Sequence, residues 1–195
     1  MRLVLATANP HKAVEIGEVL GGLGFALEPR PVDVPDVDET GSTLEENARL
    51  KAVALVAATG AAAVADDTGL EVAALDGAPG VYSARFSGED ATYESNVRKL
   101  LASLEGVEDR RARFVTVALV RFPDGREVMA EGVMEGVIAS EARGTNGFGY
   151  DPVFVPDDGD GRTYAEMSLE EKDAVSHRGR AFRLLASRLR GVVQP

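Results

Sequence analysis

Residues 2–12 indicate the fold most directly, and they read Arg-Leu-Val-Leu-Ala-Thr-Ala-Asn-Pro-His-Lys. The apolar run over residues 2–6 predicts a short buried strand. Pro10 stands where helices often begin, because its fixed φ suits the first turn and its missing N–H costs little there. Apolar residues then recur at helical spacing as far as Gly21-Gly22. The chain therefore opens as strand, loop and helix, and residues 7–9 lie at the carboxyl end of the strand, where α/β proteins bind ligands.

Further along the chain, helical and strand patterns continue to alternate. Two overlapping capping boxes, Ser42 with Glu45 and Thr43 with Glu46, predict a helix that ends near Gly60. The other expected elements are strands over 61–65 and 70–75, a helix from Asp90 or Thr92 to about Leu104, a hairpin of 113–122 with 127–138, a strand over 153–155, a short helix after Ser168 and a last helix from Ser176. This mixture argues for an α/β fold with a mixed sheet.

The composition limits the classes of site that the chain can hold. A length of 195 residues fits one domain, or two small lobes that share a core. The absence of cysteine excludes disulfides, thiolate zinc sites, iron–sulfur clusters and cysteine nucleophiles. His11 and His177 are the only histidines, so a cage of several histidines around a metal is excluded as well.

The charge balance is acidic, with 21 Lys and Arg against 32 Asp and Glu and a formal net charge of −11. Such a chain repels nucleic-acid backbones and anionic membranes unless it carries a local basic patch. The excess of carboxylates suits a hard cation such as Mg²⁺, although it also serves solubility alone. No apolar run reaches 18 residues and no signal peptide is recognisable, so we expect a cytoplasmic protein.

Two acidic stretches are candidates for catalysis or metal binding. Asp66-Asp67 stands at the end of a predicted strand, and Glu39 follows Asp38 in a loop rich in Asp and Pro. Successive strand side chains point to opposite faces, so at most one of Asp66 and Asp67 faces a given cleft. Either stretch could provide a Mg²⁺ ligand or a base that activates water, or could be a solvated turn.

The basic candidates are Lys12, Lys51, Lys172, Arg178 and Arg85. Lys12 and Arg178 each lie at the start of a predicted helix. A cation beside the backbone N–H groups of a helix N-terminus suits phosphate. Phe148 stands between Gly147 and Gly149 and could stack on a nucleobase or belong to the core. The motifs of Walker-type NTPases, dinucleotide oxidoreductases, zinc proteases and α/β-hydrolases are absent from the sequence.

Seven blocks of the sequence together resemble the inosine triphosphate pyrophosphatase family, the housecleaning dITP/XTP pyrophosphatases. The blocks are residues 5–12 (LATANPHK), 39–41 (ETG), 46–52 (ENARLKA), 65–70 (ADDTGL), 77–85 (GAPGVYSAR), 147–154 (GFGYDPVF) and 171–179 (EKDAVSHRG). The resemblance runs in order from residue 3 to about residue 189, which is nearly the whole chain.

The resemblance implies one pyrophosphatase domain over residues 1–195 that hydrolyses non-standard purine nucleoside triphosphates (ITP, dITP, XTP) between the α and β phosphates. It implies an elongated two-lobed α/β fold, with a long central mixed sheet flanked by helices and a cleft between the lobes. It also implies Mg²⁺ as cofactor and a homodimer, with neither nucleic acid nor membrane as partner.

Site residues follow from the same resemblance. Asp67 matches the catalytic base, and Glu39 and Asp67 match the metal-binding acids. The positions that match substrate contacts are Thr7, Asn9 and Lys12 at the triphosphate, Thr68, the base-binding loop of Phe148, Gly149, Tyr150 and Asp151, and Lys172, His177 and Arg178. Donors from His177 or Arg178 would favour 6-keto purines, whose position 6 accepts a hydrogen bond.

Three departures from the family pattern bear on rate and selectivity. Ala8 and His11 stand where glycine is usual, and Thr68 replaces the more usual serine. Three other functions remain open: a pyrophosphatase for other modified nucleotides, including pyrimidines; a nucleotide-binding protein without catalysis; and a structural interaction domain. Intact Glu39, Asp67 and Lys12 argue against the second, and the glycine-rich loop around Phe148 argues against the third.

Overall fold

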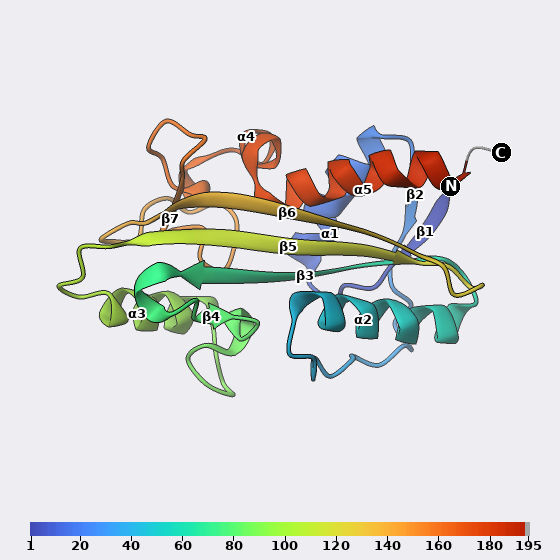
Figure 1. Cartoon of the computed structure of the whole chain (residues 1–195), viewed down its shortest axis with the longest axis horizontal. Helices are drawn as coiled ribbons and strands as arrows, with labels where there is room; N and C mark the ends of the chain where they lie inside the picture. The colour runs from blue at the N-terminus through green and yellow to red at the C-terminus, as the bar shows by residue number, and fades with distance from the viewer. Residues whose placement is uncertain (194–195) are drawn as a thin grey trace. The chain divides into compact units, whose positions relative to one another are not determined.

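A computed structural model describes residues 1–193 and confirms the α/β class (Figure 1). The strands are β1 (Arg2–Leu5), β2 (Ala26–Glu28), β3 (Ala63–Val72), β4 (Pro79–Gly80), β5 (Arg111–Arg121), β6 (Glu127–Ile138) and β7 (Phe154–Pro156). The helices are α1 (Pro10–Gly22), α2 (Leu44–Thr59), α3 (Tyr93–Ser103), α4 (Leu169–Val175) and α5 (His177–Val193).

All the strands belong to one mixed sheet. Its order is β2-β1-β3-β5-β6-β7, with β4 paired to β3 outside this path. β1 is parallel to β2 and to β3, whereas β4 is antiparallel to β3 and β7 is antiparallel to β6. The long mixed sheet that the resemblance implies is therefore confirmed.

The chain divides into two compact units. Unit 1 holds residues 1–67, 116–132 and 178–195, and unit 2 holds residues 68–115 and 133–177. The long strands β3, β5 and β6 each contribute residues to both units. Two lobes were expected, and these units confirm them; the cleft between lobes stays a prediction.

Unit 1 has a sheet covered by helices on both faces. One core joins Leu3 and Val64 of the strands to Ile16 of α1 and Phe182 of α5. A second core joins the alternate strand residues to Ala48, Ala52 and Leu55 of α2. Because neighbouring strand residues point to opposite faces, α1 and α5 cover one face of the unit 1 sheet and α2 covers the other (Figure 1).

Unit 2 has a core of its own that is rich in aromatic side chains. Leu100 of α3, Phe114 of β5, Phe154 of β7 and Tyr164 are all buried in it. The Phe114 and Phe154 rings meet edge to face, with centroids 4.7 Å apart. This core fixes the elements from which the candidate residues of unit 2 project.

Local sequence determines the helix ends. Pro10 begins α1, as predicted, and Gly60 ends α2 in the left-handed conformation that glycine adopts without strain. Thr43 caps α2 by accepting a hydrogen bond from the Glu46 N–H. The predicted box of Ser42 with Glu45 is not the one that forms, because the Glu46 carboxylate accepts from both the N–H and the hydroxyl of Ser42.

The structure corrects one prediction that concerns the site. Asp66 and Asp67 do not end a strand, since β3 runs unbroken from Ala63 to Val72. Gly69 keeps an extended conformation, so the two predicted strands over 61–65 and 70–75 join in β3, and residues 73–75, which were predicted as strand, form a short 3-10 helix instead. The sequence analysis also missed β2, which pairs with β1.

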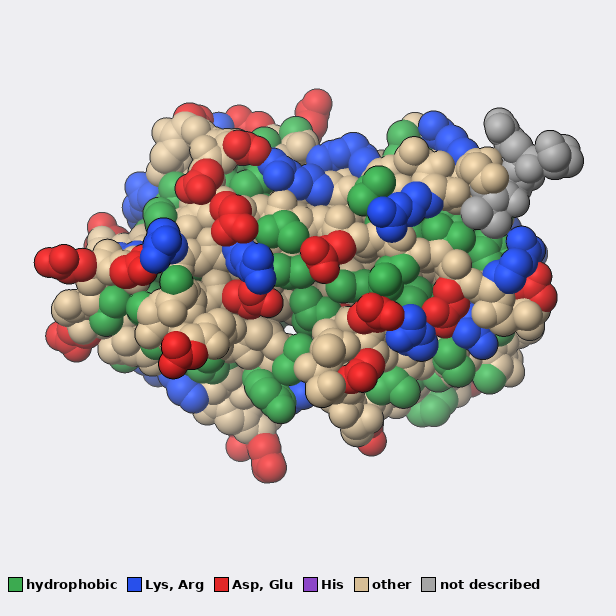
Figure 2. Space-filling model, viewed as in Figure 1, with side chains coloured by type: hydrophobic (Ala, Val, Ile, Leu, Met, Phe, Trp, Pro, Cys, Tyr) green, Lys and Arg blue, Asp and Glu red, His purple; other side chains and the backbone are tan. Residues whose placement is uncertain are grey.

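Within residues 1–193, none of the helices combines the length and the apolarity that crossing a bilayer requires. Figure 2 shows Lys and Arg side chains interspersed with Asp and Glu over the visible face.

Candidate active site

The loop between β1 and α1 is held in one conformation by its own side chains. The Asn9 side-chain oxygen accepts hydrogen bonds from the N–H groups of His11 (3.0 Å) and Lys12 (3.4 Å). The Thr7 hydroxyl accepts from the Asn9 N–H at 3.1 Å. Leu5 pairs with Val64 in the parallel register, so Thr7 continues beside Asp66 of β3. The loop therefore presents the start of α1 next to the first of the two aspartates.

Asp66 lies in a buried cluster of alternating charges, which we call the Asp66 cluster: Lys12, Glu15, Asp66 and Arg178. The Lys12 ammonium is 3.0 Å from Asp66 Oδ2, and the Arg178 guanidinium is 3.4 Å from the same oxygen. Arg178 also pairs with the Glu15 carboxylate, and only 2 % of Arg178 is exposed. A buried charge is tolerated only when it is paired in this way.

The charges within the Asp66 cluster determine the protonation states of Asp66 and Lys12. Burial alone would raise the pKa of Asp66, but Lys12 and Arg178 outweigh it and hold that pKa well below the usual 3.8. Burial lowers the pKa of Lys12 from its ordinary value of 10.5, and Asp66 opposes that shift. Asp66 is therefore an anion that holds Lys12 and Arg178 in place, and it is a poor proton acceptor.

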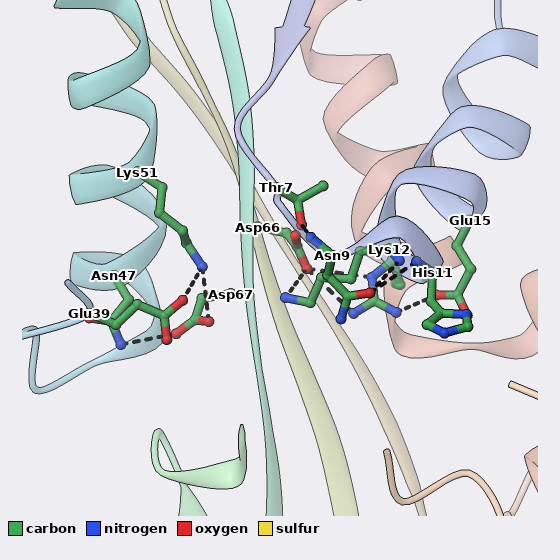
Figure 3. A network of polar contacts seen from close by, with 11 residues as sticks. Thr7, Asn9, His11, Lys12, Glu15, Glu39, Asn47, Lys51, Asp66 and Asp67 are labelled. Carbon is green, nitrogen blue, oxygen red and sulfur yellow. Dashed lines mark hydrogen bonds and ion pairs between the residues drawn. The ribbon is translucent and has the colours of Figure 1, made fainter. Parts of the chain in front are cut away.

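Asp67 points to the other side of β3 and belongs to a second group, the Asp67 cluster: Glu39, Asn47, Lys51 and Asp67 (Figure 3). The Lys51 ammonium lies 2.8 Å from Glu39 Oε1 and 3.2 Å from Asp67 Oδ1. The Asn47 amide donates to Asp67 Oδ2 at 3.1 Å. The opposite orientation of the two aspartates is as predicted.

Gly41 allows the loop that carries Glu39 to approach α2 closely. Its N–H donates to the Asn47 side-chain oxygen at 2.8 Å. A Cβ at position 41 would lie 2.6 Å from the Glu46 Cβ and 2.7 Å from that Asn47 oxygen, distances that real Cβ atoms do not show. Asn47 thus ties the Glu39 loop to Asp67 through its two amide atoms.

The electrostatics of Asp67 differ from those of Asp66. Burial raises the pKa of Asp67, and Lys51 and Lys12 only partly oppose this. Burial would lower the pKa of Lys51, but Asp67, Asp66 and Glu39 together raise it. Of the two aspartates, Asp67 is therefore the better proton acceptor.

The Asp67 cluster has the donor set that Mg²⁺ requires. Carboxylate oxygens of Glu39 and Asp67 already converge on one cation, the Lys51 ammonium. Mg²⁺ commonly uses one or two protein carboxylates and takes its other ligands from substrate phosphates and water. Among residues 1–193 there is no group of three or more acidic or histidine side chains that could hold a metal alone. The residues therefore fit a metal that is shared with a phosphate substrate.

Unit 2 holds the predicted base-binding loop and Lys172. The Lys172 ammonium lies 2.5 Å from Asp151 Oδ2, and each side chain is only 4 % exposed. The same Asp151 oxygen accepts from the Phe148 N–H at 2.9 Å. A Cβ at Gly147 would lie 2.1 Å from it, and Gly147 has a φ of +72°. Asp151 therefore stabilises the conformation of the loop through the Phe148 N–H. It also holds the Lys172 ammonium beside the Phe148 ring, 5.0 Å from the ring centroid.

Two other predicted residues of unit 2 are buried in its core. The Tyr150 hydroxyl donates to the Ser83 carbonyl at 2.9 Å, and burial raises the Tyr150 pKa. The His177 ring stacks on Phe114 with centroids 4.3 Å apart and planes 15° from parallel. Both side chains thus pack in the unit 2 core. The contacts of Tyr150, His177, Thr68 and Gly149 with substrate stay predictions.

The structure also adds residues that the sequence analysis did not assign to the site. Lys51 is one of the basic candidates of the sequence, which gives it no specific role, and the sequence does not distinguish Asn47 and Glu15 from ordinary helix residues. The signal for Asn47 was its place in the block of residues 46–52. Glu15 is three residues after Lys12 and shares its helix face, but only the structure shows its partner, Arg178.

Comparison with known proteins shows the family to which the chain belongs. A model of the Ham1 family matches residues 3–188. The chain belongs to the Ham1 family. The resemblance that the seven sequence blocks carry is thereby confirmed.

Curated relatives match along nearly their full lengths. The dITP/XTP pyrophosphatase of Symbiobacterium thermophilum is 50% identical over 196 residues, which cover 99% of this chain and 97% of the relative. The dITP/XTP pyrophosphatase of Geobacter sulfurreducens is 51% identical over 193 residues, covering 96% of each.

Solved structures of Ham1 proteins share the fold. The HAM1 protein of Coxiella burnetii superimposes with a TM-score of 0.88 at 42% identity, covering 98% of this chain and 99% of that one. The Ham1 protein of Staphylococcus aureus gives a TM-score of 0.86 at 40% identity, covering 98% and 100%.

Proposed function

We propose that this Ham1 protein hydrolyses non-standard purine nucleoside triphosphates (ITP, dITP and XTP) to the monophosphate and pyrophosphate, and so removes them from the nucleotide pool. The observation that carries the proposal is the Asp67 cluster, where Glu39, Lys51 and Asp67 form a carboxylate–cation group and Asp67 also feels the charge of Lys12 in the first turn of α1. The names of relatives about 50% identical over nearly the whole chain support this activity.

The triphosphate binds at the start of α1 in this proposal. Asn9 and Thr7 hold the loop that leads into α1, the helix whose first turn carries Lys12. A helix N-terminus with a cation beside it favours anions. Asp66 fixes the position of the Lys12 ammonium, and Arg178, which also pairs with Glu15, balances part of the Asp66 charge.

Asp67 accepts the proton of the attacking water. Its pKa is raised by burial, which brings a carboxylate closer to the range where it is an effective base. The Asn47 amide fixes one carboxylate oxygen and Lys51 contacts the other, so the group is oriented before substrate arrives. Lys12 and Lys51 then stabilise the charge that develops on the phosphate oxygens.

Mg²⁺ is the cofactor in this proposal, and Glu39 and Asp67 would hold it. When bound, the ion would supply positive charge that neutralises phosphate oxygens. The chain's own contribution is the pair of converging carboxylates, which the Lys51 ammonium keeps from repelling each other.

The base-recognition residues of the proposal lie in unit 2. Phe148 stacks on the base, and Lys172 lies beside it with Asp151 as counter-ion. Thr68, Gly149, Tyr150 and His177 are carried over from the family resemblance as further substrate contacts. Arg178 acts on the substrate through Lys12, because its guanidinium is engaged by Asp66 and Glu15.

The same resemblance leads us to propose one enzyme domain over residues 1–195 that acts as a homodimer in the cytoplasm. Continuity of β3, β5 and β6 through both units supports a single domain. Neither nucleic acid nor membrane is a partner in this proposal, in keeping with the net charge of −11.

A pyrophosphate-release assay on the purified protein tests the proposal. The substrates are ITP, dITP, XTP, GTP, ATP and UTP, each with Mg²⁺ and with EDTA. We expect release from ITP, dITP and XTP in Mg²⁺ only, with GTP, ATP and UTP turned over much more slowly. Equal turnover of UTP would favour a pyrophosphatase of broader range, and binding of ITP without pyrophosphate release would favour a non-catalytic nucleotide-binding protein.

A further inference from the structure

Tyr93 contacts the ring of Phe148 within unit 2. The two ring centroids are 5.8 Å apart and the planes are tilted by 47°. This separation lies within the 4.5–7 Å over which aromatic rings attract each other. Tyr93 is 41 % exposed, so its ring is not one of the buried aromatic rings of the unit 2 core.

The elements that carry the two rings are tied to one backbone atom. The Ser83 carbonyl oxygen accepts from the Asn96 amide at 3.3 Å and from the Tyr150 hydroxyl at 2.9 Å. Asn96 is three residues after Tyr93 on α3, and Tyr150 is two residues after Phe148. The approach of the rings is therefore fixed by buried hydrogen bonds on both sides.

The first turn of α3 is fixed as well. The Thr92 hydroxyl accepts from the Ser95 N–H at 3.1 Å, and the Ser95 hydroxyl accepts from the Thr92 N–H at 2.8 Å. This capping box sets the direction of Tyr93, the first residue of the helix. None of these bonds involves the Tyr93 side chain, so a substitution there leaves the helix start intact.

Phe148 also has a contact with Lys172, whose ammonium is 5.0 Å from the ring centroid and pairs with Asp151. A phenyl ring on a glycine-flanked loop has rotational freedom about χ1 and χ2 that packing must restrict. Lys172 and Tyr93 together restrict the rotation of the Phe148 ring, Lys172 through its ammonium group and Tyr93 through its aromatic ring.

We infer that Tyr93 is a positioning residue for base recognition: it holds the Phe148 ring in the orientation that stacks on a purine. The inference rests on the proposed function, and it adds a residue that lies outside the seven sequence blocks. Tyr93 acts through Phe148 and does not itself take part in phosphate chemistry. Its removal therefore affects binding of the base and leaves the phosphate end unchanged.

The test measures KM and kcat for ITP with wild type, Tyr93→Ala, Tyr93→Phe and Arg98→Ala, and the inhibition constant of inorganic tripolyphosphate against ITP for each. Arg98→Ala is a matched surface change on the same helix. We expect Tyr93→Ala to raise KM about 2- to 10-fold, the range of one aromatic pair, with kcat within about twofold of wild type. Tyr93→Phe and Arg98→Ala keep the wild-type KM. The inhibition constant of tripolyphosphate, which has no base, stays the same in all four.

Other results overturn the inference. A Tyr93→Ala enzyme with the wild-type KM, or one that loses kcat or tripolyphosphate affinity to the same extent, shows that Tyr93 does not act through the base. A Tyr93→Phe enzyme as impaired as Tyr93→Ala shows that the hydroxyl matters and the ring contact does not. If the wild-type enzyme is inactive on ITP, the proposed function is refuted instead. In that case the binding of IMP, measured by calorimetry, tests the inference separately. Equal affinities of wild type and Tyr93→Ala for IMP would refute it.

Discussion

Asp66 and Asp67 are neighbours in β3, yet their carboxylates meet different lysines on opposite faces of the sheet. Asp66 lies 3.0 Å from the Lys12 ammonium, and Asp67 lies 3.2 Å from the Lys51 ammonium. Burial favours a higher pKa for both carboxylates, but Lys12 and Arg178 outweigh it at Asp66 and lower its pKa, whereas burial prevails at Asp67 and raises its pKa. One aspartate is thus suited to hold cations and the other to accept a proton, and the two make different predictions.

Asp67→Asn removes the proton acceptor and keeps the shape. We expect turnover of ITP to fall about 10²–10⁴-fold, the usual contribution of a general base. The melting temperature should change little, since Asn can still accept from the Asn47 amide. Pyrophosphate release and thermal unfolding measure the two effects. Wild-type turnover by Asp67→Asn would refute the assignment of Asp67 as the base.

Asp66→Asn leaves Lys12 and Arg178 without their shared anion inside unit 1. Removing one partner from a buried charge group costs about 3–5 kcal/mol. We therefore expect a large loss in the free energy of unfolding, measured by urea denaturation. Asp109→Asn is the matched control, because Asp109 pairs with Arg111 at an exposed position, and it should leave the midpoint unchanged. Equal midpoints for Asp66→Asn and Asp109→Asn would contradict the structural role given to Asp66.

Gly41→Ala tests the close approach of the Glu39 loop to α2. The added methyl would meet Glu46 Cβ at 2.6 Å, so the loop must move and Glu39 with it. We expect kcat/KM to fall at least about 10-fold, because small displacements of catalytic groups are costly. The Mg²⁺ concentration for half-maximal activity should rise as well.

Gly17→Ala is the control for that variant. A Cβ at Gly17 of α1 meets nothing within 4 Å, and alanine favours a helix interior. Gly17→Ala should therefore keep wild-type kinetics with equal or higher stability. If Gly41→Ala shows the same Mg²⁺ dependence as Gly17→Ala, the position of Glu39 does not depend on Gly41.

Glu171 predicts a dependence of stability on pH. Its hydrogen bonds to the Arg162 guanidinium and to the Ser168 N–H lower its pKa from 4.5 to about 2. A depressed folded-state pKa stabilises the fold above the unfolded pKa, and this contribution is lost as the pH falls through the folded value. The difference in melting temperature between wild type and Glu171→Gln should therefore be constant above pH 5 and shrink between 4.5 and about 2. A difference that grows on acidification would contradict this sign.

Features that depend on local sequence were predictable. Pro10 and Gly60 mark helix ends through their own backbone preferences, and the β-rich run over residues 113–122, followed by a turn signal and residues 127–138, predicts the strands that form β5 and β6. The opposite orientation of Asp66 and Asp67 follows from strand geometry alone.

Features that depend on distant partners were not predictable. Thr68-Gly69 resembles a turn, but pairing with other strands keeps β3 extended through it. The sequence places Arg178 at a helix start, but it does not show that Arg178 pairs with Glu15, 163 residues earlier. The contact of Arg178 with substrate stays a prediction. Asn47 reaches Asp67 only because α2 packs against the unit 1 sheet.

The central claim is that the chain cleaves the triphosphate between its α and β phosphates with Asp67 as base. Phosphorus NMR of the products formed from dITP and Mg²⁺ tests it most directly, with wild type and Asp67→Asn in parallel. The account predicts dIMP and pyrophosphate in equal amounts from wild type and almost no product from Asp67→Asn. Release of inorganic phosphate with dIDP, or equal product from both proteins, would contradict it.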